Sequence, residues 1–114
     1  MSVVTQTIDN SNYMVMKIGH KTVKCLIDTG SCNTIVNERL ATALKVRIDS
    51  LKRGDSTQLF TASGTPLFVV GKCDLKMNLS GLLVPHTVLI VRNLQENFIL
   101  GTDFMRQNKV ILDF

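Results

Sequence analysis

One carboxylate in the sequence stands where acid–base chemistry could use it. Asp28 directly follows the apolar run 25–27 and is itself followed by Thr29 and Gly30. The apolar run predicts a buried strand, and Gly30 permits the tight turn that would present Asp28 at its end. A carboxylate in such a place is costly unless hydrogen bonds satisfy it or a reaction uses it. Taken alone, Asp-Thr-Gly is explained equally well as a turn that ends a strand.

A second segment favours the chemical interpretation. Residues 97–105 read as an apolar strand, a glycine at 101 and a short helix. Together, Leu-Ile-Asp-Thr-Gly at 26–30 and Ile-Leu-Gly at 99–101 resemble the retropepsins, the aspartic proteases of retroviruses and long-terminal-repeat retrotransposons. That family pairs an apolar-apolar-Asp-Thr/Ser-Gly motif with a later apolar-apolar-Gly, and it carries a hairpin flap where residues 60–67 lie here. The resemblance covers nearly the whole chain.

The resemblance implies a homodimer in which two chains share one active site. Pepsin-like enzymes carry two Asp-Thr/Ser-Gly motifs in one chain, whereas this chain has one. Cleavage by a pair of carboxylates needs two aspartates, so a symmetric dimer would supply Asp28 twice. The family also interleaves its chain ends across the dimer. Here the alternating apolar residues of 110–114, with Val3, Val4 and Ile8 near the other end, suit that role.

Roles for individual residues follow from the same resemblance. Asp28 would be catalytic, Thr29 would brace the two active-site loops, and Gly30 would let the substrate backbone approach. Substrate would also contact six further residues: Leu26, Ser31, Ile35, Ser63, Gly64 and Ile99. Two of these belong to the flap, and the three aliphatic ones match pocket-lining positions, although core packing explains each nearly as well. The hydroxyl of Ser31 is expected to donate to the carboxylate of Asp28 and favour its charged form.

Two departures separate this chain from typical retroviral enzymes. Many of those have alanine and then an acidic residue after Asp-Thr-Gly, where this chain has Ser31 and Cys32. Many also have arginine after the later glycine, where this chain has Thr102. In those relatives the acid and the arginine pair, so losing both leaves no unpaired charge. The chain thus stands nearer to the proteases of retrotransposons or to cellular retroviral-like proteases.

The pattern of apolar residues predicts one all-β domain over residues 1–114. Strands are expected at 13–18 and 22–27 as a hairpin, at 58–70 as two short strands around a turn at 62–66, and at 72–79, 82–91, 98–100 and 110–114. Short helices are expected at 37–44, capped by Asn37, and from 102 or 103 to 108. About eight short strands give a small, closed, barrel-like fold. The resemblance identifies it as a retropepsin fold with a flap hairpin, half of a symmetric dimer.

The composition limits which partners and cofactors the chain is expected to bind. The net charge is +4, but the basic residues are scattered without interleaved aromatic residues, which argues against a nucleic-acid partner. No apolar run is long enough to span a membrane, and the first residues lack the pattern of a signal peptide. Cys25, Cys32 and Cys73 suggest neither a disulfide framework nor a zinc site, so we expect no metal and no other cofactor. Reduced thiols fit a cytoplasmic location, which for a retroelement includes virus-like particles.

The main prediction is an aspartic endopeptidase that cleaves extended peptides or polyproteins, and three other interpretations stay open. Cys32 could be a nucleophile with His20 or His86 as its base, although neither histidine lies in a recognisable motif. The domain could be a dimerisation scaffold without turnover, against which the intact Asp-Thr-Gly argues. It could also be a cellular protease of the DNA-damage-inducible type, acting on substrates of the ubiquitin pathway.

Overall fold

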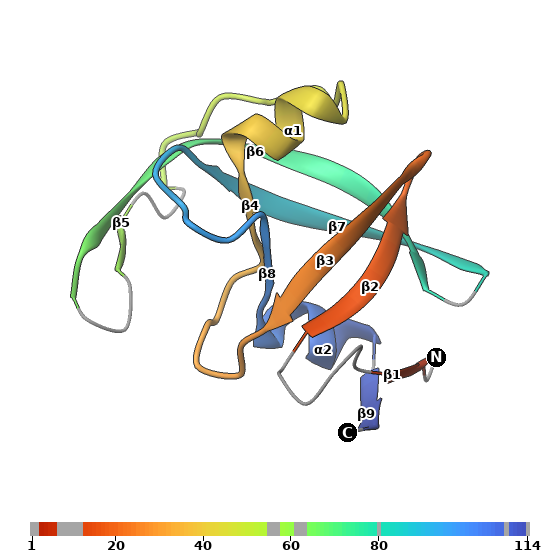
Figure 1. Cartoon of the computed structure of the whole chain (residues 1–114). Helices are drawn as coiled ribbons and strands as arrows, with labels where there is room; N and C mark the ends of the chain where they lie inside the picture. The colour runs from red at the N-terminus through yellow and green to blue at the C-terminus, as the bar shows by residue number, and fades with distance from the viewer. Residues whose placement is uncertain are drawn as a thin grey trace.

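Strands dominate the computed structural model, which describes residues 3–6, 13–54, 58–60, 64–79, 81–108 and 110–113 (Figure 1). In chain order the elements are β1 (Val3–Gln6), β2 (Tyr13–Ile18), β3 (Lys21–Ile27), β4 (Ile35–Asn37), α1 (Glu38–Ala43), β5 (Gln58–Phe60), β6 (Pro66–Leu79), β7 (Leu82–Val91), β8 (Phe98–Leu100), α2 (Thr102–Asn108) and β9 (Val110–Asp113). The prediction of an all-β fold with short helices is confirmed.

Six of these strands close into a barrel. Their hydrogen-bonded order is β2-β3-β8-β4-β7-β6, and the register pair Lys17–Asn78 joins β6 back to β2. Strand β5 pairs with the start of β6 outside this ring, and Figure 1 shows the two projecting away from the barrel. We call β5 and residues 64–68 the flap arm. It falls where the sequence predicted the flap, although residues 61–63, including Ser63, lie outside the described residues.

Strand β8 brings the two sequence motifs together. It runs parallel to β3, with Leu26 opposite Ile99, and antiparallel to β4, with Ile35 opposite Ile99. Ile99 therefore lies between the strand that delivers Asp28 and the strand that follows the Asp-Thr-Gly turn. This pairing joins segments that are far apart in the sequence, and it makes the site a product of the whole barrel.

The barrel interior is filled by aliphatic, methionine and cysteine side chains. Alternate residues point inward along three strands: Met14, Met16 and Ile18 in β2, Val23, Cys25 and Ile27 in β3, and Cys73, Leu75 and Met77 in β6. The largest fully buried side chains are Phe98 and Phe104, from β8 and α2. Because period-2 alternation fixes which face is buried, it also fixes the register of each strand.

The expectation of one strand that follows the 62–66 turn and ends at residue 70, and of a separate strand at 72–79, was wrong, because β6 continues through both. A bulge between Val69 and Gly71 takes up the irregularity that the sequence suggested as a break. A Cβ at position 71 would lie 2.6 Å from the carbonyl oxygen of Asp49, so only glycine fits there. The backbone of Asp49 approaches Gly71 closely and exchanges two hydrogen bonds, of 2.7 and 2.9 Å, with the backbone of Lys72.

Both helices form close to their predicted positions. Asn37 caps α1, since its side-chain oxygen accepts a 2.7 Å hydrogen bond from the backbone of Arg39. Helix α2 begins at Thr102, so Thr102 and Asp103 both lie in its first turn. Among the described residues, there is no helix with the length and apolar character that a membrane span requires.

The two ends of the chain meet. Strands β1 and β9 pair in parallel as a separate two-stranded sheet, with Val3 opposite Val110, and Figure 1 shows them next to α2. The sequence predicted that these segments would interleave with those of a second copy. Pairing across two copies stays a prediction, and Ile8 and Phe114 lie outside the described residues.

Candidate active site

Asp28 lies in a tight turn directly after β3. Its backbone N–H donates to the carbonyl of Leu100 at 3.0 Å, which continues the pairing with β8. Its carbonyl accepts a 3.1 Å hydrogen bond from the N–H of Ser31, and the N–H of Gly30 donates to its Oδ1 at 2.9 Å. The backbone of Asp28 is therefore held on both sides, and its half-buried carboxylate accepts a hydrogen bond from Gly30. The predicted position of Asp28 at a strand end is confirmed.

Gly101 supports this turn from below. The N–H of Thr102 donates to the carbonyl of Ser31 at 2.8 Å. A Cβ at Gly101 would lie 2.4 Å from the carbonyl oxygen of Asn33 and 2.8 Å from that of Ser31. The loop that carries Asp28 packs on the bare backbone of Gly101, which is the physical reason for a glycine in the second motif.

The predicted role of Ser31 toward Asp28 is not observed. Its Oγ donates to the carbonyl of Asn33 at 2.7 Å instead. Short polar side chains commonly make such local bonds to nearby backbone, because the partner is already within reach. The hydrogen-bond donor to the carboxylate of Asp28 is the backbone of Gly30.

A cavity of about 370 Å³ opens in front of Asp28. Five of its lining residues are among the predicted site residues: Asp28, Gly30, Ser31, Ile35 and Ile99. Three further apolar side chains line it: Phe60 and Leu67 from the flap arm, and Leu94 from the loop before β8. No pattern in the sequence pointed to Leu94, because a position in an irregular loop has no periodicity from which to infer its direction.

The other predicted site residues that the structure describes, Leu26, Thr29 and Gly64, do not line this cavity. Thr29 is exposed in the turn, and Leu26 is half-buried in β3 without lining the cavity. Gly64 adopts a left-handed backbone, with φ of +89°, which suits the tip of a hairpin. Their proposed roles all concern a second copy or a bound peptide.

A buried polar network beneath the turn was missed by sequence reasoning. The Thr34 hydroxyl, only 1% exposed, donates to Asp103 Oδ1 at 2.8 Å and accepts from the Gly101 N–H at 3.2 Å. The other carboxylate oxygen of Asp103 lies 2.8 Å from Nε2 of His86, which is 8% exposed. The network ties β7 and α2 to Gly101, the glycine on which the Asp28 turn packs.

The network favours the ionised form of Asp103. Burial raises the pKa of its carboxyl, but hydrogen bonds from His86, Thr34 and the Phe104 backbone, together with the charge of His86, outweigh burial and lower the pKa. A lowered folded-state pKa stabilises the fold at pH values above the unfolded-state pKa. That contribution is lost as the pH falls through the folded-state value.

Replacing Asp103 with alanine is expected to destabilise the fold by about 2–4 kcal/mol at neutral pH, because it leaves Thr34 and His86 buried without their partner. Asp103→Asn keeps the shape of the side chain and should lower the free energy of unfolding by less than Asp103→Ala does. Urea unfolding at fixed protein concentration measures both, and the deficit of Asp103→Asn should shrink on acidification. Asp74→Ala, at an exposed aspartate that also accepts from a threonine, is the control and should leave stability unchanged. Equal losses at positions 74 and 103 would contradict this assignment.

The cysteines offer little support for thiol chemistry. Burial raises the pKa of the Cys25 thiol to about 12, as expected for a small core residue. Cys32 is exposed, but among the described residues no hydrogen bond joins it to His20 or His86. The part of the chain that the structure describes contains no group of three or more His, Cys, Asp or Glu side chains that could hold a metal ion.

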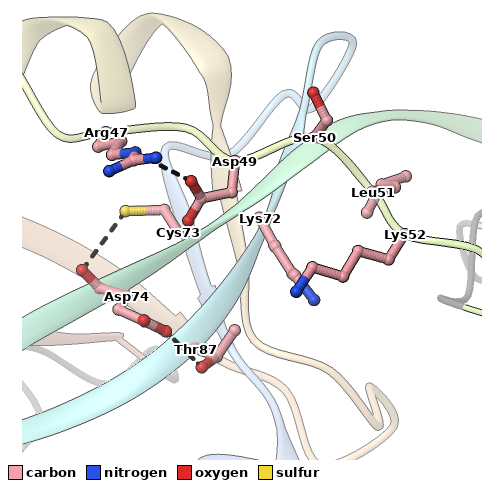
Figure 2. A pocket seen from close by; sticks show the side chains of 9 residues that line it. All are labelled: Arg47, Asp49, Ser50, Leu51, Lys52, Lys72, Cys73, Asp74 and Thr87. Carbon is pink, nitrogen blue, oxygen red and sulfur yellow. Dashed lines mark hydrogen bonds and ion pairs between the residues drawn. The ribbon is translucent and has the colours of Figure 1, made fainter.

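The larger cavity shown in Figure 2, of about 660 Å³, lies away from Asp28 between residues 47–52 and strands β6 and β7. Three of its charged groups have neighbours within the cavity: Arg47 Nε lies 3.1 Å from Asp49 Oδ1, and Thr87 donates to Asp74 at 2.6 Å. Burial, then Asp74 and Asp49, raise the pKa of the Cys73 thiol, which disfavours the thiolate. This cavity contains none of the predicted site residues.

Comparison with known proteins agrees with the fold. Residues 14–107 match the family model described as gag-polyprotein putative aspartyl protease. The retroviral protease-like domain of Ddi1 from Leishmania major superposes with a TM-score of 0.71 at 21% identity, covering 89% of this chain and 80% of that one. EIAV protease complexed with the inhibitor HBY-793 superposes with a TM-score of 0.72 at 16% identity, covering 94% of this chain and 96% of that one. The chain therefore belongs to the gag-polyprotein aspartyl protease family and has the retropepsin fold.

Proposed function

We propose that this chain is an aspartic endopeptidase with Asp28 as its catalytic carboxylate. The observation that carries the proposal is the position of Asp28, whose carboxylate accepts a hydrogen bond from Gly30 and lines a cavity that two flap-arm residues, Phe60 and Leu67, also line. A carboxylate that served only to end a strand would need no cavity in front of it. The matching family model adds gag-type polyproteins as the proposed substrate class.

The chemistry requires two copies of the chain. A water that attacks a peptide carbonyl must lose a proton to one group while a second group protonates the carbonyl oxygen. Each chain offers one Asp-Thr-Gly, so a symmetric homodimer brings two Asp28 side chains together. Two carboxylates this close do not both ionise readily, and the pair therefore holds one proton over a broad pH range.

The proposed reaction follows from that shared proton. The ionised Asp28 takes a proton from water, and the protonated Asp28 of the other copy donates to the scissile carbonyl. A tetrahedral intermediate forms without a covalent bond to the enzyme. The flap arm closes over the extended peptide and excludes water, while Thr29 braces one turn against the other. The aliphatic and aromatic lining of the cavity favours large apolar side chains beside the cut bond.

Specific activity should fall when the protein is diluted, because each active site needs two chains. Cleavage of a peptide pool, with and without pepstatin, is measured over the same dilution series as sedimentation. The activity should follow the dimer fraction and disappear with the inhibitor. A fully active monomer would contradict the shared site. A stable dimer that binds peptides and never cuts them would instead support the scaffold interpretation.

A further inference from the structure

The groove in front of Asp28 continues into a second compartment. A neighbouring cavity of about 320 Å³ shares Leu67, Leu94 and Ile99 with the first, so the two form one groove. The compartments differ in character. Apart from Asp28 itself, the first is lined mainly by apolar side chains. The second is lined also by polar side chains, and Glu96 is the one charged residue among the described residues that line it.

The carboxylate of Glu96 is oriented by a hydrogen bond. The hydroxyl of Tyr13, at the start of β2, donates to Glu96 Oε1 at 2.8 Å. Both side chains are half-buried, and the Nζ of Lys24 lies 4.3 Å from the centre of the Tyr13 ring. A carboxylate accepts several hydrogen bonds, so one bond from a tyrosine leaves acceptor capacity for a ligand. Such a preset carboxylate loses little side-chain entropy when it binds a cation.

Because the two compartments adjoin, the geometry of an extended peptide indicates which of its residues reaches Glu96. In an extended peptide successive side chains point to opposite sides, and residues i and i+2 share one side about 7 Å apart. Adjoining compartments on one wall are therefore filled by alternate residues. The residue that reaches Glu96 is two positions from the one that fills the apolar compartment beside Asp28.

We propose that Glu96 makes this groove select peptides with lysine or arginine two residues from the apolar residue at the cut bond. The proposal rests on the proposed function, which supplies the extended peptide and the position of the cut. In a symmetric dimer the preference applies on both sides of the cut, since each copy contributes one Glu96. Tyr13 acts as a positioning residue for that carboxylate.

Three peptides that differ only at this position, with lysine, glutamine or glutamate, test the proposal. The wild-type protein should cleave them in that order, with the lysine peptide about tenfold better than the glutamate peptide in kcat/KM, mostly through KM. Glu96→Gln should abolish the difference, and Glu96→Lys should reverse it. Tyr13→Phe keeps the ring and removes the donor, so it should reduce the preference without abolishing it. Glu38→Gln, at an acid that lines neither compartment and pairs with Arg92, should retain the preference.

Cleavage of the glutamine peptide separates this proposal from the proposed function. If no variant and no wild-type protein cuts that peptide, the protease assignment fails. The charge preference is then measured as peptide binding to Asp28→Asn by fluorescence anisotropy. If Glu96→Gln cuts the glutamine peptide normally and still prefers lysine over glutamate by the wild-type ratio, Glu96 does not select the substrate. A wild-type protein without any lysine preference would overturn the proposal equally.

Discussion

Replacing Asp28 with asparagine is expected to reduce peptide cleavage by about a thousandfold or more, while the fold and the dimer remain. Asparagine has nearly the same shape, and its Oδ1 can still accept the hydrogen bond from the N–H of Gly30. It can neither take a proton from water nor hold the proton that the second carboxylate shares. Loss of a residue that acts in such a unit typically removes most of the catalytic effect.

The measurement is kcat/KM on an apolar-flanked peptide, with circular dichroism and sedimentation on the same samples. Asp74→Asn is the matched control, since Asp74 is an exposed aspartate remote from the cavity at Asp28. It should retain full activity. Cleavage at the normal rate by the Asp28 variant would exclude this carboxylate as the catalytic group and with it the proposed mechanism.

Replacing Gly101 with alanine is expected to destabilise the fold by at least about 3 kcal/mol and to abolish cleavage. The new Cβ would lie 2.4 Å from the carbonyl oxygen of Asn33, and backbone cannot yield as a flexible side chain does. The loop that carries Asp28 must therefore move away from β8 and α2. Loss of activity should exceed what the unfolded fraction alone explains, because molecules that stay folded still have a displaced turn.

Gly19→Ala is the control for this substitution. Gly19 has φ of +62°, and no described atom lies within 4 Å of the point that a Cβ would occupy, so alanine there meets backbone strain without a clash. Its expected cost is about 1 kcal/mol, with no loss of specific activity. Urea unfolding and peptide cleavage are compared for both variants. Equal effects at positions 19 and 101 would show that steric support of the Asp28 loop is not what Gly101 provides.

The features that sequence alone predicted are those written in short, local patterns. The 13–27 hairpin follows from alternating apolar residues around a turn, and the position of Asp28 from an apolar run that ends at a glycine-containing turn. The Asn37 cap is likewise local, because its partner is two residues away. Each of these depends on contacts within a few residues, so no knowledge of the barrel was needed.

The features that were missed depend on contacts between distant segments. Thr34 meets Asp103 and Gly101 only because β4 and β8 pair, and Glu96 meets Tyr13 only because the barrel brings its loop against β2. The continuous β6 was misjudged because Gly71 resembles a break in the sequence, whereas in the barrel it makes room for Asp49. A nearby backbone partner can also replace a predicted side-chain partner, since Ser31 bonds to the carbonyl of Asn33 and not to Asp28.

The contact between His86 and Asp103 restricts how this sequence can drift over evolutionary time. Replacing Asp103 alone leaves the buried His86 without this partner, and replacing His86 alone removes a hydrogen bond from Asp103, whereas a simultaneous change to another complementary pair need do neither. The two positions therefore form an epistatic unit, in which the fitness effect of one residue depends on the identity of the other. A lineage that replaces both residues one at a time must pass through a less stable single mutant. Whether that mutant still folds depends on how much the rest of the barrel contributes to stability.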